Sequence, residues 1–219
     1  MTQRILLPLL LCSVLFVGCD SSTSDGGEAE PPVLLPLDVG NEWVMAFTRY
    51  DEDGTLTESY TDTLRVVGDT TVAGERWAEI RCAQTPTGCI PGGFYSNRED
   101  GVWRWYGPGS DVAPYLLYKY PADVGDTYEQ PSGFIDFNMT VRGTDAPVDT
   151  PAGTLLAYHY VLDADSVNGS PVPDEVGQLD RYLVPGQGFA FIDCSYITLR
   201  DEWVTLSEFG WELIAFEGD

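Results

Sequence analysis

Two nearly identical stretches of sequence decide the fold: "PLDVGNEW" at residues 36–43 and "PADVGDTY" at residues 121–128. Proline excludes a central position in a β-sheet, and the glycine of each stretch permits a positive φ in a tight turn. The aromatic residue at the end of each stretch, Trp43 or Tyr128, is suited to begin a strand as a large core residue. We therefore expect the same turn and strand start in each of two similar halves.

Further landmarks follow both stretches in the same order and at nearly the same spacing. They are Gly68 and Gly143, the pairs Ala73-Gly74 and Ala152-Gly153, Tyr95 and Tyr182, and finally Gly101 and Gly188, each six residues after its tyrosine. A series of landmarks in one order at near-equal spacing indicates internal repetition. We therefore predict a duplication, with one half at residues 36–120 and the other at residues 121–219.

Both halves consist of short segments rich in β-branched and aromatic residues, separated by turns that contain Gly, Pro and Asp. The predicted strands cover residues 43–50, 61–68, 76–82, 101–106, 114–120, 134–143, 154–162, 178–184, 188–197 and 210–216. No segment shows a sustained apolar period of 3.6 residues with caps, so helices should be minor. We predict an all-β antiparallel barrel, half-barrel or sandwich of about 10–12 strands. The two halves should share one core and form a single domain over residues 36–219.

The chain is strongly acidic, with 35 Asp and Glu against 11 Lys and Arg and a formal net charge of −24. Binding to nucleic acid requires clustered basic residues that neutralise phosphates, and the sequence has no basic run. Nucleic acid is therefore excluded as a partner. The acidic residues indicate a solvated soluble surface or an adaptation to high salt, where screening makes dense like charge less costly.

The first residues, "MTQRILLPLLLCSVLFVGCD", have one basic residue followed by an apolar stretch at residues 5–17. This pattern is typical of a signal peptide, predicted here at residues 1–18, and the stretch is too short to span a bilayer stably. The ending "LFVGC" resembles the lipobox of bacterial lipoproteins, although Phe16 stands where that family usually has leucine. The resemblance implies that Cys19 is acylated and becomes the new N-terminus. The alternative is a plain cleaved signal peptide in which this cysteine is incidental.

Residues 19–35 are predicted to be the lipidated cysteine and a flexible acidic tether, because "DSSTSDGGEAEPP" is polar and rich in Gly and Ser. Two or three acyl chains would anchor the protein stably to a membrane. The expected location is therefore the bacterial cell envelope, on the periplasmic side or at the cell surface.

The mature domain resembles a group of acidic all-β lipoproteins of environmental bacteria. The motifs that carry this resemblance are "G-x-x-W" at residues 40–43, "P-A-G-T" at residues 151–154 and "Y-x-x-P-G-x-G" at residues 182–188. These motifs are structural, and the resemblance implies no activity. A more distant likeness to the open barrels of lipoprotein-carrier proteins would imply a concave lipid-binding surface.

The sequence offers few candidates for chemistry. His159 is the only histidine, and alignment of the halves places it opposite Ile80 on an apolar face. We therefore expect a packed, hydrogen-bonded histidine in the core or a cavity, with no catalytic role. There is no "G-x-S-x-G" motif to present a nucleophilic serine. "RYDEDGTLTESY" at residues 49–60 fails the calcium-loop pattern, because Arg49 and Tyr60 would occupy ligand positions. We predict no catalytic residue, no metal site and no cofactor.

Three cysteines remain once Cys12 of the apolar stretch and the predicted anchor residue are set aside: Cys82, Cys89 and Cys194. A disulfide is expected in an oxidising envelope. The pairing of Cys82 with Cys89 is the first choice because it closes a short loop. Pairing of Cys82 with Cys194, or no pairing, are the alternatives.

These observations favour a lipid-anchored β domain that acts as a non-enzymatic binding or interaction module. Its partners would be the membrane, through the anchor, and an unknown protein, glycan or apolar ligand. The first alternative is a carrier with an open-barrel cavity for an apolar ligand such as a lipid. The second is a carbohydrate-active hydrolase, which needs two carboxylates about 5–10 Å apart in a cleft.

Overall fold

The computed structural model describes residues 32–51, 53–84, 91–131, 135–167, 170–171, 178–199 and 203–218. Every regular element in these ranges is a β-strand, and every strand pair is antiparallel, so the predicted all-β antiparallel fold is confirmed. Over the same ranges, no helix is long and apolar enough to cross a membrane. The strands are β1 (Glu42–Tyr50), β2 (Leu56–Val72), β3 (Glu75–Cys82), β4 (Gly93–Arg98), β5 (Gly101–Trp105), β6 (Tyr115–Lys119), β7 (Thr127–Pro131), β8 (Ile135–Thr150), β9 (Gly153–Val167), β10 (Ser170–Pro171), β11 (Gln178–Val184), β12 (Gly188–Leu199) and β13 (Trp203–Glu217).

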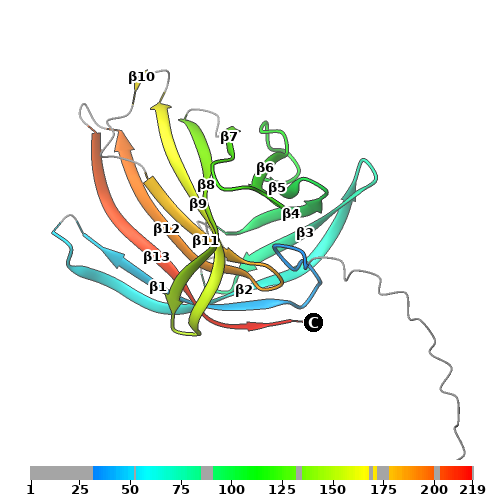
Figure 1. Ribbon diagram of the computed structural model, residues 1–219, viewed down its shortest axis with the longest axis horizontal. Helices are drawn as coiled ribbons and strands as arrows, with labels where there is room; N and C mark the ends of the chain where they lie inside the picture. The colour runs from blue at the N-terminus through cyan, green and yellow to red at the C-terminus, as the bar shows by residue number, and fades with distance from the viewer. Residues whose placement is uncertain are drawn as a thin grey trace, which may run out of the picture. The chain divides into compact units, whose positions relative to one another are not determined.

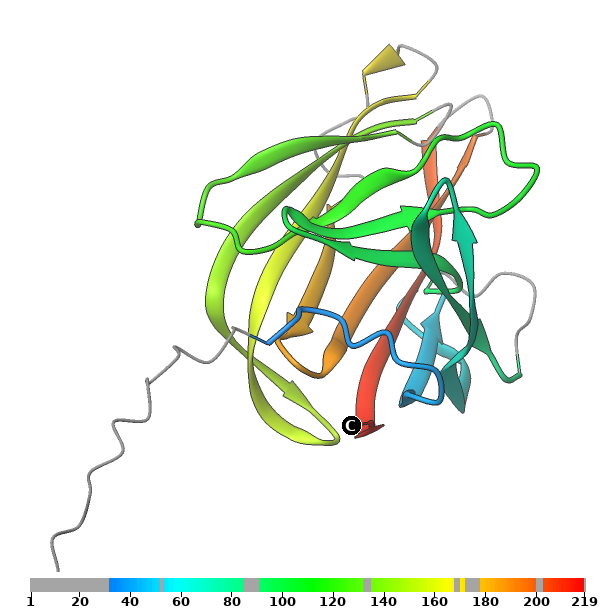
Figure 2. The ribbon, with the colours of Figure 1, turned by 90° about the vertical axis from the view of Figure 1, so that its right-hand side faces the viewer.

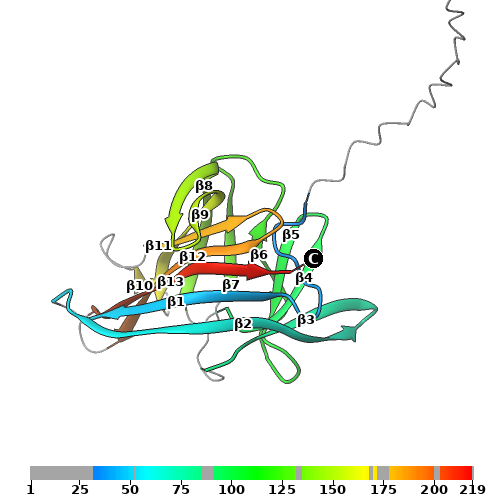
Figure 3. The ribbon, with the colours of Figure 1, turned by 90° about the horizontal axis from the view of Figure 1, so that it is seen from below.

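The strands form one sheet in the order β6-β5-β4-β3-β2-β1-β13-β12-β11-β9-β8-β7, with the short β10 paired to β9. The sheet curls until its two edge strands, β6 and β7, approach each other, as Figure 1 shows. Among the predicted alternatives, the structure is therefore a nearly closed barrel. Figure 3 shows β1 and β13 side by side in the middle of the sheet, so the first and last strands of the domain pair with each other.

The sheet order repeats after six strands. The first strand of each half lies next to the last strand of the other half: β1 lies beside β13, and β7 lies beside β6. The two junctions differ in how they are closed. Backbone pairing runs along the whole of β1 and along Glu208–Glu217 of β13, whereas side chains of β7 bond to the backbone of β6. We call the β6–β7 junction the seam.

The turns at residues 36–43 and 121–128 have the same structure. Their glycines have φ values of 105° and 97°, and their backbones make the same set of hydrogen bonds. In the first turn these are Gly40 N to Val66 O, Asn41 N to Asp38 O and Val66 N to Asn41 O; in the second they are Gly125 N to Val141 O, Asp126 N to Asp123 O and Val141 N to Asp126 O. The internal duplication remains a prediction, and this match supports it.

Two further landmarks mark bulges, where one extra residue bends a strand. The register of β2 on β3 shifts between Val66 and Gly68. The register of β8 on β9 shifts between Val141 and Gly143. The strand is therefore bent at the corresponding place in each half.

Aromatic side chains fill the barrel interior. Trp43 on β1 lies 5.5 Å from Phe189 on β12, measured between ring centroids. Tyr95 on β4 lies 6.3 Å from the same Phe189, although β4 and β12 are five strands apart in the sheet order. Tyr118 on β6 and Tyr160 on β9 meet across the seam at 5.1 Å. Where these rings meet, the interior of the barrel is a packed core.

The hairpin of β8 and β9 folds over the outer face of the sheet, where Figure 1 shows it crossing β11, β12 and β13. The register shifts on both sides of Gly143 bend it, and its tip bonds to β13 through Ala152 N and Leu213 O at 3.1 Å. A second, smaller core lies beneath it. That core contains Val148, Ala157, Val184 and Ala190, with Leu155, Tyr182 and Phe191 packed against it.

Candidate functional site

The segment Pro32–Leu37, which we call the lead-in segment, crosses one end of the barrel, as Figure 2 shows in blue. We call this end the mouth. Leu34 and Leu35 are almost fully buried, so residues that the sequence assigned to the tether belong to the folded domain. Gly188 is required here, because a Cβ atom on it would lie 2.5 Å from the side chain of Leu35.

The backbone of the lead-in segment is bonded to several different elements around the mouth. Each of its bonded carbonyl oxygens accepts from a donor on a separate part of the barrel. The hydrogen bonds, each written from donor to acceptor, are Tyr120 OH to Pro32 O at 2.9 Å, Gly186 N to Val33 O at 2.7 Å, Asn97 Nδ2 to Leu35 O at 2.9 Å and Arg76 Nη2 to Leu37 O at 3.1 Å. The segment is therefore a structural part of the mouth.

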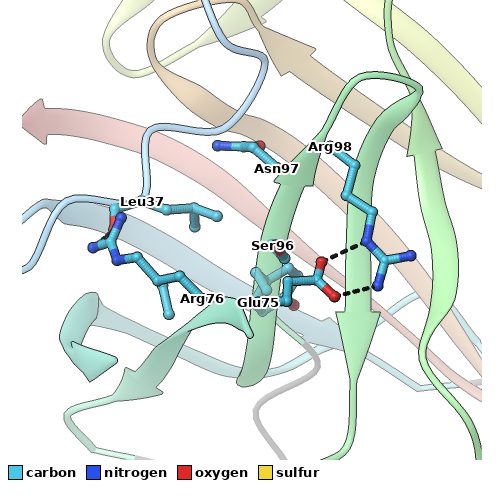
Figure 4. A pocket seen from close by; sticks show the side chains of 8 residues that line it. Leu37, Glu75, Arg76, Ser96, Asn97 and Arg98 are labelled. Atoms are coloured by element: carbon cyan, nitrogen blue, oxygen red, sulfur yellow. Dashed lines mark hydrogen bonds and ion pairs between the residues drawn. The ribbon is translucent and has the colours of Figure 1, made fainter. Parts of the chain in front are cut away.

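A polar pocket of about 300 Å³ lies between the lead-in segment, the start of β3 and the end of β4 (Figure 4). Ala78 and Tyr95 are its most deeply buried residues, and two further lining residues, Leu37 and Ser96, are also buried. The other lining residues are Glu75, Arg76, Asn97 and Arg98. The volume is at the small end of the range for sites that bind small molecules, and we take this pocket as the candidate functional site.

Glu75 and Arg98 form a tight ion pair beside the pocket. The guanidinium donates to the carboxylate through Nε at 2.5 Å and Nη2 at 2.7 Å, and it stacks over the ring of Trp103 at 3.8 Å. The hydrogen bonds from Arg98 hold the pKa of Glu75 below its ordinary value. A carboxyl group with a lowered pKa is ionised at neutral pH and is a poor general acid. Glu75 is the only acid among the lining residues, so the pocket lacks the carboxylate pair of a glycoside hydrolase.

Arg76 and Asn97 connect the pocket to the lead-in segment, since both line the pocket and both bond to carbonyls of that segment. Arg76 is also held by Asp69, whose Oδ2 accepts from Nε at 2.7 Å, while Asp38 lies 4.0 Å away. Figure 4 shows Arg76 and Asn97 turned toward Leu37, whereas the carboxylate of Glu75 turns away toward Arg98.

The sequence did not indicate this pocket. Its residues come from three separate segments, at Leu37, at the start of β3 and at the end of β4. A usable signal was the scarcity of basic residues: in a chain with 11 Lys and Arg, Arg76 and Arg98 line one pocket.

Arg104 lies among tyrosines next to the packed core. Its Nη2 donates to Gly92 O at 2.9 Å, and its guanidinium carbon lies 5.0 Å from the ring of Tyr106 and 5.9 Å from that of Tyr95. Burial raises the pKa of Tyr95 to about 12, so this phenol is neutral at physiological pH. The arrangement is a half-buried cation among neutral aromatic rings, which is a stabilising environment for guanidinium.

His159 lies on the outer face of β9, so its predicted place on the apolar interior face is wrong. Its Nε2 lies 2.5 Å from Asp180 Oδ1, and its ring stacks on Tyr182 with centroids 4.3 Å apart. The registers explain the error: Val66 pairs with Ile80 and Val141 with Tyr160, so Tyr160 is the counterpart of Ile80. A shift of one residue moves a side chain to the opposite face.

Cys82 is buried at the end of β3 and is disulfide-bonded. Cys89 and Cys19 lie outside the described residues, and of Cys194 only the backbone is described. The pairing of Cys82 with Cys89 therefore remains a prediction. The sheet order favours it, because β12, which carries Cys194, lies four strands from β3, and a disulfide needs Cα atoms within about 7 Å.

In the part of the chain that the structure describes, no three His, Cys, Asp or Glu residues are grouped so that they could hold a metal ion.

No protein-family model matches the chain, and no curated protein matches it. Two solved structures are similar. One is a candidate exported protein with a YmcC-like fold from Bacteroides fragilis, with a TM-score of 0.39 and 13% identity, over 85% of this chain and 100% of that chain. The other is a candidate lipoprotein from Parabacteroides distasonis, with a TM-score of 0.35 and 12% identity, over 86% of this chain and 100% of that chain. At this level, neither similarity carries an argument about the activity of this chain.

Proposed function

We propose that this protein is a lipid-anchored component of the bacterial cell envelope whose β domain is a non-enzymatic binding module. The signal-like segment ending in "LFVGC" supports acylation of Cys19. The anchor would hold the domain by the mouth, because the chain enters the folded domain there through the bonded lead-in segment. The matching turns and sheet order support assembly of the domain by internal duplication.

The observation that carries the binding function is the contrast between a packed interior and a polar pocket at the mouth. Rings from β1, β4 and β12 meet inside the barrel, so among the described residues the interior there is filled by aromatic side chains. The pocket instead presents the polar side chains of Asn97, Arg76 and Ser96 beside the apolar surface of Leu37. Such a lining suits a small polar group better than a lipid tail.

The anchor is tested by replacing Cys19 and following acylation and location. In a Cys19→Ala variant expressed in a Gram-negative bacterium, incorporation of radiolabelled palmitate should be lost and the protein should move to the soluble envelope fraction. Cys12→Ala is the matched control, because Cys12 lies in the apolar stretch that the signal peptidase removes, and it should remain acylated and membrane-bound. A Cys19→Ala protein that stays in the membrane fraction would contradict the proposed anchor.

The pocket is tested by screening a library of small polar fragments against the ¹⁵N-labelled domain by NMR. Fragments that bind should shift the amide signals of Ala78 and Asn97, which line the pocket. The amide of Leu56, in the hairpin at the opposite end of the barrel, serves as the internal reference and should not move. If fragments bind only away from the pocket, or none binds at millimolar concentration, the pocket is not the binding site.

A further inference from the structure

The two ends of the barrel differ in their exposed side chains. The direction of each strand determines which turns and hairpins lie at the mouth. β1 starts at the mouth, so in an antiparallel sheet the hairpins β2–β3, β4–β5, β8–β9 and β11–β12 also lie there. The β6–β7 turn and the end of β13 join them. Figure 2 looks onto this end, with the hairpins arranged around the lead-in segment.

Exposed aliphatic side chains gather at the mouth. Among the described residues, those at this end are Val33, Val39, Val72, Val124 and Leu156, with exposed fractions between 39% and 63%. The other exposed large apolar residues lie elsewhere: Tyr50, Leu56 and Tyr106 at the opposite end, and Val67 along β2.

Two of these side chains occupy the same position in the two turns. Val39 is 56% exposed and Val124 is 63% exposed, and each directly precedes the turn glycine. Because the sheet order repeats after six strands, the two turns lie at the same end of the barrel but on different sides of it. A flat apolar surface could therefore touch both valines at once.

On the proposed acylation of Cys19, the chain itself brings a membrane surface to the mouth. The lead-in segment begins at Pro32, and residues 20–32 span at most about 45 Å when fully extended. A short flexible tether keeps two attached surfaces at an effective concentration of about millimolar. Even a weak affinity of the mouth for lipid would then be enough to populate the contact.

The carboxylates at the mouth determine which lipid headgroups could lie against it. Asp38 and Asp123 directly precede the exposed valines, whereas Asp126, after the second turn glycine, is paired with Lys119 at 2.8 Å. Carboxylates at this end would be repelled by anionic headgroups. Zwitterionic headgroups with an ammonium group would be tolerated, because each carries a positive charge that can approach the carboxylates.

We propose that the mouth lies against the surface of a zwitterionic bilayer, with Val39 and Val124 in contact with the headgroup region. The proposal rests on the proposed acylation of Cys19, which supplies the tether. It also places the polar pocket near the bilayer, since Leu37 and Asn97 belong to both the mouth and the pocket.

The contact is tested on the acylated protein, labelled at Val and Leu methyl groups and incorporated into nanodiscs of phosphatidylethanolamine and phosphatidylcholine. A small fraction of lipid with a gadolinium chelate on its headgroup broadens the signals of nearby methyl groups. The methyl signals of Val39 and Val124 should broaden at least threefold more than those of Leu56. Equal broadening, or stronger broadening of Leu56, would overturn the proposed contact while leaving the anchor intact. A protein that does not associate with the nanodiscs would overturn both.

Matched variants separate the valines from the tether. Val39→Asp combined with Val124→Asp should reduce the excess broadening of mouth methyl signals that lie away from the tether, such as those of Val72, over those of Leu56. The control, Tyr50→Asp combined with Val67→Asp, changes two exposed residues away from the mouth turns and should preserve it. Replacing a third of the lipid with phosphatidylglycerol should weaken the broadening at Val39, and an increase would contradict the charge argument.

Discussion

At the scale of single residues, glycines with a positive φ fall into two kinds. Gly125 needs only its backbone conformation, since a Cβ atom there would meet nothing within 4 Å. Gly101 needs space as well, because its Cβ atom would lie 2.1 Å from the carbonyl oxygen of Tyr118 and 2.7 Å from the amide nitrogen of Tyr120. The two positions should therefore respond differently to the same substitution.

Gly101→Ala should destabilise the domain much more than Gly125→Ala. Strain from a positive φ costs about 1–3 kcal/mol in either variant, and overpacking against the backbone of β6 should add at least about 2 kcal/mol for Gly101. Urea unfolding followed by tryptophan fluorescence measures both values. Equal losses in the two variants would show that the contact between Gly101 and β6 is less tight than the structure has it.

The sequence predicted the turn glycines but not this difference, because the turn is local and the contact is not. Gly40 and Gly125 could be recognised from the residues on either side of them. The contact of Gly101 depends on where Tyr118 lies, and the sequence does not reveal which edge of β5 receives β6. The misplacement of His159 has a similar origin, since a one-residue difference in register is invisible in an alignment of the two halves.

At the scale of elements, the seam replaces a backbone ladder with side chains. Tyr128 OH accepts from Lys119 N at 3.0 Å and donates to Leu117 O at 3.1 Å. Gln130 Nε2 donates to Leu117 O at 2.6 Å, and Tyr160 OH donates to Lys119 O at 2.8 Å. These bonds satisfy backbone groups at the free edge of β6, which would otherwise be open to pairing with another chain.

Tyr128→Phe should destabilise the domain by about 1–3 kcal/mol, because it removes the acceptor of the Lys119 amide, whereas Leu117 O keeps its bond from Gln130. The amide of Lys119 should also exchange faster with deuterium. Tyr106→Phe is the matched control: its hydroxyl accepts a long bond from Tyr115 OH at 3.3 Å, and the residue is 49% exposed. That variant should lose less than about 0.5 kcal/mol. Unchanged exchange at Lys119 in Tyr128→Phe would show that the hydroxyl does not hold the seam.

Strands with regular alternation were predicted well, whereas of the short polar strands β4 was missed and β7 was expected only through its start at Tyr128. The long segments that became β1, β2, β9 and β12 were recognised from their β-branched and aromatic residues. β4, with the sequence "GFYSNR", and β7, with the sequence "TYEQP", are short and polar. Pairing with the neighbouring strands holds β4 and β7 in the sheet, and this pairing cannot be recognised from the sequences of the two strands themselves.

At the scale of the whole molecule, the sequence predicted the fold class and left its closure open among barrel, half-barrel and sandwich. Closure depends on the pairing of β1 with β13, whose residues are far apart in the chain. The polar pocket shares this limit, because Leu37, the start of β3 and the end of β4 meet only after the sheet has curled. The strands are thus encoded by local sequence, whereas the closure of the barrel and the polar pocket depend on contacts between residues far apart in the chain.

The arrangement in which each half ends beside the start of the other has an evolutionary consequence. Neither half can close its own sheet, since β1 completes its pairing on β13 and β7 lies against β6. On the proposed duplication, an ancestor of half the present length would have completed the ring only as a homodimer. The present chain is then a fusion of two subunits, and the turn between β6 and β7 is the link that made their association permanent.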